Sequence, residues 1–157
     1  MAKQSVNRLS VPRFIPRYRI TLVPESGHNA PCGVLRDSAA AAVALRPCFA
    51  GLDREQFLVC CLDAKNVSIG VNIVSIGSLT LSIVHVREVF KSAILLNAAA
   101  IIAVHNHSSG DPTPSAEDRT LTTRLREAGE LLGIRLLDHL ILGDDRLYSF
   151  ADQGWPL

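Results

Sequence analysis

The residues with the clearest chemical potential lie in one short stretch of the chain. His105 and His107 are two positions apart, and on an extended backbone that spacing directs both imidazoles to the same face. Residues 108–114 are rich in Ser, Gly, Asp and Pro, which favours a loop that folds the chain back and can bring Asp118 beside the histidines. Two histidines and one carboxylate form a zinc ligand set with a position left for water, as in catalytic sites. Water acidified by zinc is a nucleophile at neutral pH.

Each of these residues also has a plainer interpretation. Ser115 and Asp118 fit the start of a helix as its N-cap and the acid of a capping box. Negative charge is favourable in the first turn of any helix. A lone pair of nearby histidines is more often a pair of ordinary surface or core residues. On this argument Asp118 cannot both bind a metal and bond back to the cap, and the two histidines decide for the metal.

The same residues resemble the signature of a known family. His-x-His, seven residues, Ser, two residues and Asp is the signature of the JAMM (MPN+) metalloprotease domain, and every spacing from His105 to Asp118 matches it. Over residues 55–154 the chain resembles the RadC family of bacterial JAB-domain proteins. The stretches that carry this wider resemblance, besides the histidine block, are Glu55-Gln56-Phe57 with Leu62-Asp63, Arg87-Glu88-Val89-Phe90, Asn97-Ala98-Ala99-Ala100 and Leu137-Asp138-His139-Leu140.

The resemblance implies a zinc-dependent hydrolase of peptide or isopeptide bonds. It assigns Ser115 a hydrogen bond to the oxygen that becomes negative in a tetrahedral intermediate. It also implies a glutamate at the start of an early strand as general base. Glu55 fits because it precedes the apolar run from Phe57 to Leu62, although from the sequence alone it is one of many acids. Glu88 is the runner-up, but it lies in a predicted helix.

Neighbouring polar residues have open roles. Asn106, Ser109 and Asp111 either orient the ligands or only shape the loop. We interpret His139 as structural or as a support for a ligand. The family usually has proline where this chain has Ser108, and that change costs about 0.4–1 kcal/mol through the unfolded state. Other zinc chemistries lack their motifs, since the chain has neither His-Glu-x-x-His nor a Pro-Cys-x-x-Cys that follows His-x-Glu.

The elements that must position these residues alternate between strands and helices. We predict strands at 18–23, 55–63, 67–75, 99–104, 134–142 and 146–149, and helices at 39–45, 85–96 and 115–132. The uncharged run 99–104 predicts a central strand that is buried on both faces and delivers His105 at its carboxyl end. This order favours an α/β or α+β sandwich around a mixed sheet. The resemblance implies, more narrowly, a three-layer JAB/MPN fold akin to cytidine deaminases.

Composition sets the remaining expectations. The 157 residues are the size of one domain, and a net charge of +1 gives no global attraction to nucleic acid or membranes. No apolar run reaches the roughly 18 residues of a membrane span, and no signal peptide is apparent. We expect a cytoplasmic protein whose cysteines are reduced thiols rather than disulfides. These are Cys32, Cys48, Cys60 and Cys61.

We divide the chain into a basic arm at residues 1–16 and a domain at 17–157. The arm carries Lys3, Arg8 and Arg13 and no acid, so it either touches phosphates or keeps the terminus soluble. Full-length RadC-like proteins have a helix-hairpin-helix DNA-binding region before the JAB domain. About fifty residues precede Glu55, so the resemblance is to a short form.

Two functions remain open. The first is the zinc hydrolase, acting on a peptide or protein substrate that the sequence does not name. The second is a binding module in DNA repair or mobile-element biology, with a structural or idle metal site. The near-neutral charge predicts weak or no direct DNA binding. The oligomeric state has no signature in the sequence.

Overall fold

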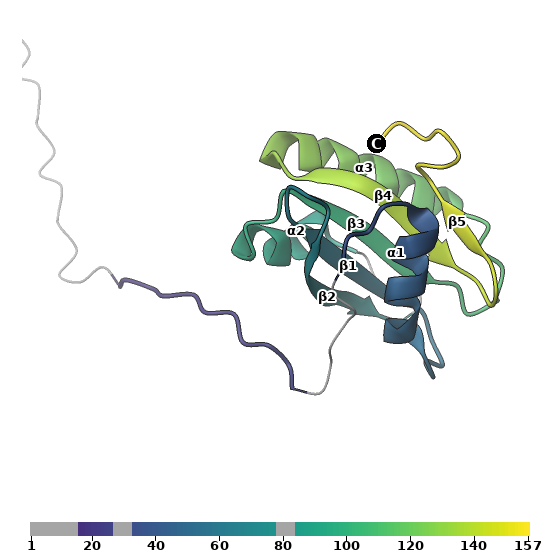
Figure 1. Cartoon of the computed structure of the whole chain (residues 1–157), viewed down its shortest axis with the longest axis horizontal. Helices are drawn as coiled ribbons and strands as arrows, with labels where there is room; N and C mark the ends of the chain where they lie inside the picture. Colours follow the sequence, from purple (N-terminus) through teal and green to yellow (C-terminus); the bar gives the residue numbers. More distant parts are fainter. Residues whose placement is uncertain (1–15, 27–32, 78–83) are drawn as a thin grey trace, which may run out of the picture.

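The computed structural model describes residues 16–26, 33–77 and 84–157. Apart from Pro16, the basic arm predicted at residues 1–16 lies outside the described residues, as does Cys32. The strand predicted at 18–23 is wrong. Residues 16–25 have no strand structure, and Tyr18 and Val23 are each 83% exposed. Figure 1 shows this segment running away from the sheet. An alternating pattern forms a strand only where a neighbouring strand takes up its backbone hydrogen bonds, and this segment lies beside none.

A five-stranded mixed sheet forms the centre of the molecule. Its strands are β1 (Gln56–Leu62), β2 (Ser68–Ile76), β3 (Ala100–Asn106), β4 (Arg135–Leu142) and β5 (Leu147–Ser149), in the order β2-β1-β3-β4-β5. Strands β3 and β4 are parallel, and the other neighbours are antiparallel. The prediction of a central strand buried on both faces is confirmed for β3. This strand continues to Asn106, so His105 lies within it rather than after its end.

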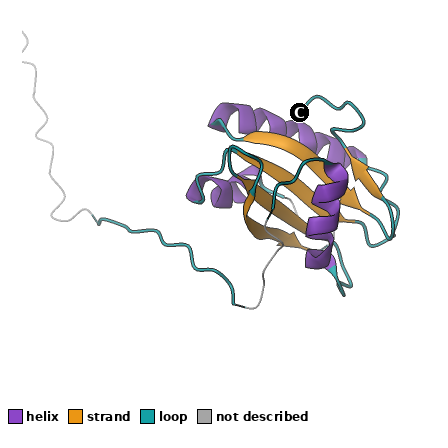
Figure 2. Cartoon of the chain, viewed as in Figure 1, coloured by secondary structure: helices purple, strands orange, loops and turns teal. Residues whose placement is uncertain are grey.

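Helices cover both faces of the sheet (Figures 1 and 2). One face carries α1 (Ser38–Leu45) and the 3-10 helix η1 (Arg46–Phe49), and the other carries α2 (Val86–Leu95) and α3 (Ala116–Leu132). An apolar cluster lies between the sheet and the helices on each face, and alternate residues of β1 belong to one cluster or the other. The α2 and α3 side receives Phe57, Val59 and Cys61, whereas the α1 side receives Leu58, Cys60 and Leu62. The predicted α/β three-layer sandwich is confirmed. The cysteines within the described part of the chain are free thiols.

Local sequence signals fix most element ends. The Asp37 carboxylate accepts a hydrogen bond from the Ala40 backbone N–H at 2.7 Å, which caps α1. Pro47 lies in the first turn of η1, where its missing N–H is tolerated. Gly133 ends α3 with a left-handed φ of 69°. The pairing of β1 with β2 is irregular next to Gly70, as at a β-bulge.

A bulge in β4 sets which of its side chains face α3. Ile101 of β3 lies opposite Leu136, but the next residue, Ile102, lies opposite Asp138. Leu137 is therefore an extra residue, and it changes the phase of the strand. His139 consequently lies beside Ala103, which belongs to the cluster under α2 and α3.

None of the helices in the described ranges is long and apolar enough to cross a membrane.

The close approach of α3 to β4 generates a stability prediction. A Cβ atom on Gly129 would lie 2.5 Å from the carbonyl oxygen of Ile134. We expect Gly129→Ala to lower the free energy of unfolding by about 1–3 kcal/mol in urea denaturation, because α3 and the backbone that leads from it into β4 must move apart. A Cβ on Gly33 meets nothing within 4 Å, so Gly33→Ala is the matched control. Helix propensity alone predicts the opposite sign, and a Gly129→Ala protein more stable than wild type would refute the packing argument.

Candidate metal centre

The two histidines reach one side of the sheet, as their spacing predicts. His105 projects from β3 on the same face as Ile101 and Ala103, toward α3. His107 follows the strand, and its backbone N–H donates to the carbonyl of Leu142 at 3.0 Å. The Nε2 atoms of the two imidazoles are 3.1 Å apart. His105 is fully buried, whereas the side chain of His107 is 13% exposed.

The loop after His107 folds back and delivers Asp118, as predicted. A turn forms where the Gly110 N–H donates to the carbonyl of His107 at 3.1 Å. Gly110 has a φ of +78°, a backbone conformation that residues with a Cβ adopt only with strain, so this turn favours glycine. Asp118, in the first turn of α3, is 2% exposed. One ligand atom from each of His105, His107 and Asp118 lies within 4.8 Å of the others, so this group could hold a metal ion.

The carboxylate of Asp118 both caps the helix and faces the histidines, so the expectation that these roles exclude each other is wrong. Its Oδ2 accepts hydrogen bonds from the backbone N–H of Ser115 at 2.8 Å and from the Ser115 hydroxyl at 2.7 Å. Its Oδ1 lies 3.2 Å from Nε2 of His105. A carboxylate oxygen has more than one lone pair, so Oδ2 completes the capping box and still lies 3.4 Å from Nε2 of His107, while Oδ1 faces His105.

The atoms that converge here are mostly hydrogen-bond acceptors. The Nδ1 atoms of both histidines have other partners, the Asp111 carbonyl for His107 at 2.8 Å and His139 Nε2 for His105 at 2.9 Å. Their Nε2 atoms therefore face each other and the carboxylate. A carbonyl can only accept, so His107 carries a proton on Nδ1. When both imidazoles are neutral with Nδ1–H, the facing Nε2 lone pairs and the carboxylate need a cation between them.

Burial and hydrogen bonding set the charges of the group. Burial raises the pKa of the Asp118 carboxyl, but the adjacent imidazoles of His105 and His107 and the Ser115 hydroxyl outweigh it and hold this pKa well below its usual range. Burial lowers the pKa of His105, which is therefore neutral. The hydrogen bond to Asp118 raises the pKa of His107. The site thus presents a fixed negative charge together with a neutral imidazole, an arrangement that attracts a cation.

Glu55 lies on the same side of the sheet as the histidines. It directly precedes β1, in which Phe57 pairs with His105, so a residue two positions before Phe57 shares that face. The carboxylate of Glu55 is also among the charges that act on the two histidines, where it opposes the larger effect of burial, which lowers the pKa of His105.

Asn106 clamps the backbone on both sides of Glu55. Its side-chain oxygen accepts from the Gln56 N–H at 2.8 Å, and its amide donates to the Arg54 carbonyl at 3.2 Å. Asn106 thus supports the strand start rather than a metal ligand. Glu88, the alternative base, lies on α2 and pairs with Lys91.

The remaining sequence-predicted residues have local partners. The Ser109 hydroxyl accepts from the Asp111 N–H at 3.3 Å, and the Asp111 carboxylate accepts from the Thr113 hydroxyl at 2.8 Å, so these side chains shape the loop. Sequence reasoning missed Thr122, whose hydroxyl contacts His139 Nδ1 at 2.7 Å. The signal was its position four residues after Asp118, which places both on one face of α3.

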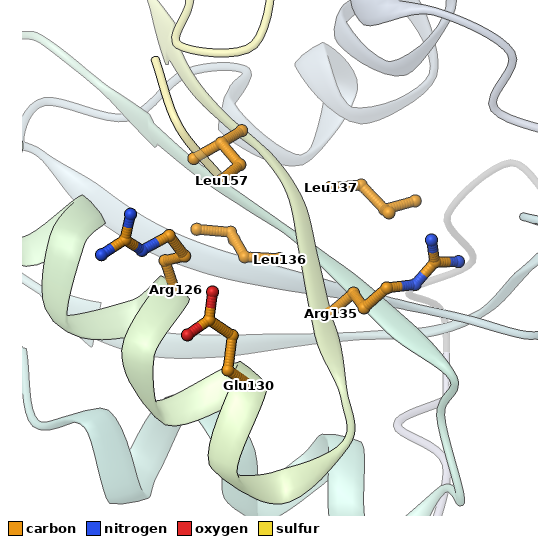
Figure 3. A pocket seen from close by; sticks show the side chains of 6 residues that line it. All are labelled: Arg126, Glu130, Arg135, Leu136, Leu137 and Leu157. Atoms are coloured by element: carbon orange, nitrogen blue, oxygen red, sulfur yellow. The ribbon is translucent and has the colours of Figure 1, made fainter.

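A pocket of about 350 Å³ lies away from this group, beside the second half of α3 (Figure 3). Its lining residues are Arg126, Glu130, Arg135, Leu136, Leu137 and Leu157. None of them belongs to the histidine–aspartate group, so the candidate metal centre is defined by its side chains and not by this cavity.

Comparison with known proteins places these observations in a family. The family model described as RadC-like JAB domain matches residues 28–155. A UPF0758 protein from Desulfitobacterium hafniense is 53% identical over 103 residues, which cover 66% of this chain and 45% of that protein. One from Caldanaerobacter subterraneus is 56% identical over 104 residues (66% and 45%), and one from Pelobacter propionicus is 58% identical over 101 residues (64% and 44%). The aligned part is thus less than half the length of these curated relatives.

Proposed function

The chain belongs to the RadC-like JAB domain family, and on that premise we propose that it is a zinc-dependent hydrolase of peptide or isopeptide amide bonds. The observation that carries the proposal is the convergence of two imidazole nitrogens and one carboxylate oxygen on the α3 side of the sheet. The names of the relatives state no activity, so the proposal stands on the site and on the family's JAB domain. We also propose a role in DNA repair, on the basis of the family, and a cytoplasmic location, on the basis of the sequence composition.

The separations of the candidate ligand atoms fit zinc. In a tetrahedral site with zinc–ligand bonds of about 2.0–2.1 Å, neighbouring ligand atoms are roughly 3.3 Å apart. The two Nε2 atoms are 3.1 Å apart. Oδ1 of Asp118 lies 3.2 Å from Nε2 of His105, and Oδ2 lies 3.4 Å from Nε2 of His107. One carboxylate oxygen would be the third ligand, and one ligand atom from each residue lies within 4.8 Å of the others, so small adjustments would bring the three side chains around the ion. Three protein ligands are the number found in catalytic zinc sites.

The proposed chemistry divides among three groups. When bound, zinc supplies Lewis acidity and lowers the pKa of water to near neutrality. Glu55 would accept a proton from the attacking water on its carboxylate and pass it to the leaving amine. Ser115 would donate to the oxygen that gains charge, a contribution of about 3 kcal/mol. Its hydroxyl now donates to Asp118, so this role requires the hydroxyl to rotate toward the substrate.

Metal content gives the first test. We expect purified protein, prepared without chelator, to contain about one zinc per chain by elemental analysis, because the ligand atoms are already in place. His107→Ala removes one ligand from the rim of the site and should abolish stoichiometric zinc. His85→Ala is the matched control, since His85 is the N-cap residue of α2 and not a member of the group. Metal-free wild-type protein would count against the proposal.

The general base gives the second test. Glu55→Gln should retain zinc but lose about 10²–10⁴-fold in rate on a panel of internally quenched peptides, since the amide cannot accept the proton. Glu88→Gln is the control, because that carboxylate pairs with Lys91 on α2. Equal losses in the two variants, or none in Glu55→Gln, would remove Glu55 from the mechanism.

The alternative is a binding module whose metal site is structural or idle. It is favoured by the length of the relatives, of which this chain spans about 45%. We expect no shift of a duplex DNA fragment by the isolated chain at about 50 mM salt, because a net charge of +1 supplies little phosphate neutralisation. A shift that weakens steeply with salt in an electrophoretic assay would favour the binding module instead.

A further inference from the structure

A fully buried histidine that the proposed chemistry does not use lies directly behind His105. His139, on β4, has no exposed surface. Its ring stacks on Phe150 with centroids 5.1 Å apart, and Phe57 lies on another side at 5.5 Å. Only its two nitrogens meet polar atoms, Nε2 at 2.9 Å from His105 Nδ1 and Nδ1 at 2.7 Å from the Thr122 hydroxyl.

The contact between Thr122 and the Asp118 carbonyl determines which atom donates in each of these hydrogen bonds. The Thr122 hydroxyl lies 2.6 Å from the backbone carbonyl of Asp118, which can only accept, so the single hydroxyl proton points there. The hydroxyl oxygen must then accept from Nδ1–H of His139. A neutral imidazole with a proton on Nδ1 has a bare Nε2, so His139 accepts from Nδ1–H of His105. His105 in turn has a lone pair on Nε2, the atom that faces His107 and Asp118.

We propose that Thr122 and His139 are positioning residues that impose the metal-binding tautomer on His105. This inference rests on the metal-binding part of the proposed function, though not on hydrolysis. His107 obtains the same tautomer from one carbonyl, that of Asp111. His105 lies inside β3, and its Nδ1 meets a side chain instead.

The choice of histidine as the supporting residue follows from its surroundings. The environment between Phe57 and Phe150 is apolar, and the buried carboxylate of Asp118 is already close. A second carboxylate there would bury another charge, which is costly without a partner. A neutral imidazole can accept from His105 and donate to Thr122 without adding a charge. The chain of hydrogen bonds also links the Asp118 backbone to His105, whose Nε2 lies 3.2 Å from the Asp118 carboxylate, so it positions two candidate ligands relative to each other.

Zinc affinity of Thr122 variants tests the proposal. We expect Thr122→Val to weaken zinc binding about 10–100-fold in competition with a chromophoric chelator, because His105 loses its fixed tautomer. Thr122→Ser keeps the hydroxyl and should restore wild-type affinity. Thr123→Val is the matched control, since the Thr123 hydroxyl makes the equivalent bond, to the Arg119 carbonyl at 3.1 Å, outside this network. Equal affinities of Thr122→Val and Thr123→Val would overturn the proposal.

A second measurement separates this inference from the proposed function. Nitrogen-15 NMR of the metal-free wild-type protein should show His105 and His139 protonated on Nδ1, with His105 becoming a mixture of tautomers in Thr122→Val. Protonation of His105 on Nε2 in the wild type would refute the inference whether or not the protein binds zinc. Absence of zinc binding by wild type, together with the expected tautomers, would refute the metalloenzyme and the metal-positioning role, and would leave only the control of the His105 tautomer by Thr122 and His139.

Discussion

The site depends on one constraint: acceptor atoms from two different elements are held about 3 Å apart in a place that water hardly reaches. Such groups repel each other unless a cation lies between them. Their positions are therefore imposed by the elements that carry them, namely the buried central strand β3 and the capped start of α3. The rest of the fold can be understood as the support that keeps these two elements in place.

The start of α3 and the candidate metal centre are one structure. Asp118 satisfies the helix with one oxygen and faces His105 with the other, so ordering the helix also orients the ligand. The loop before it packs against the turn between β4 and β5, which the guanidinium of Arg46 holds through the carbonyls of Gly143 and Asp144. Residues from α1 to β5 thus contribute to the position of a group whose own motif is only fourteen residues long.

Local patterns predicted most elements and the convergence of the metal group, because the histidine spacing, the loop composition and the helix cap are all short-range signals. They failed where the outcome depends on distant partners. The segment 18–23 has the alternation of a strand but no neighbour to pair with. The position of Glu55 follows from the register of β1 against β3, and the contact of His139 with His105 follows from the pairing of β3 with β4. Neither register can be predicted from the local sequence, because each depends on the pairing of strands that are far apart in the chain.

The bulge at Leu137 has a consequence for how this chain can vary. The extra residue lies between Leu136 and Asp138, and the pairing on either side of it is regular. Deletion of Leu137 would therefore leave Ile102 opposite Asp138 and Ala103 opposite His139, so the imidazole would keep its face. One further deletion before His139 would turn the imidazole toward α1 and away from His105, so this strand can lose one residue, but not two, without moving the histidine.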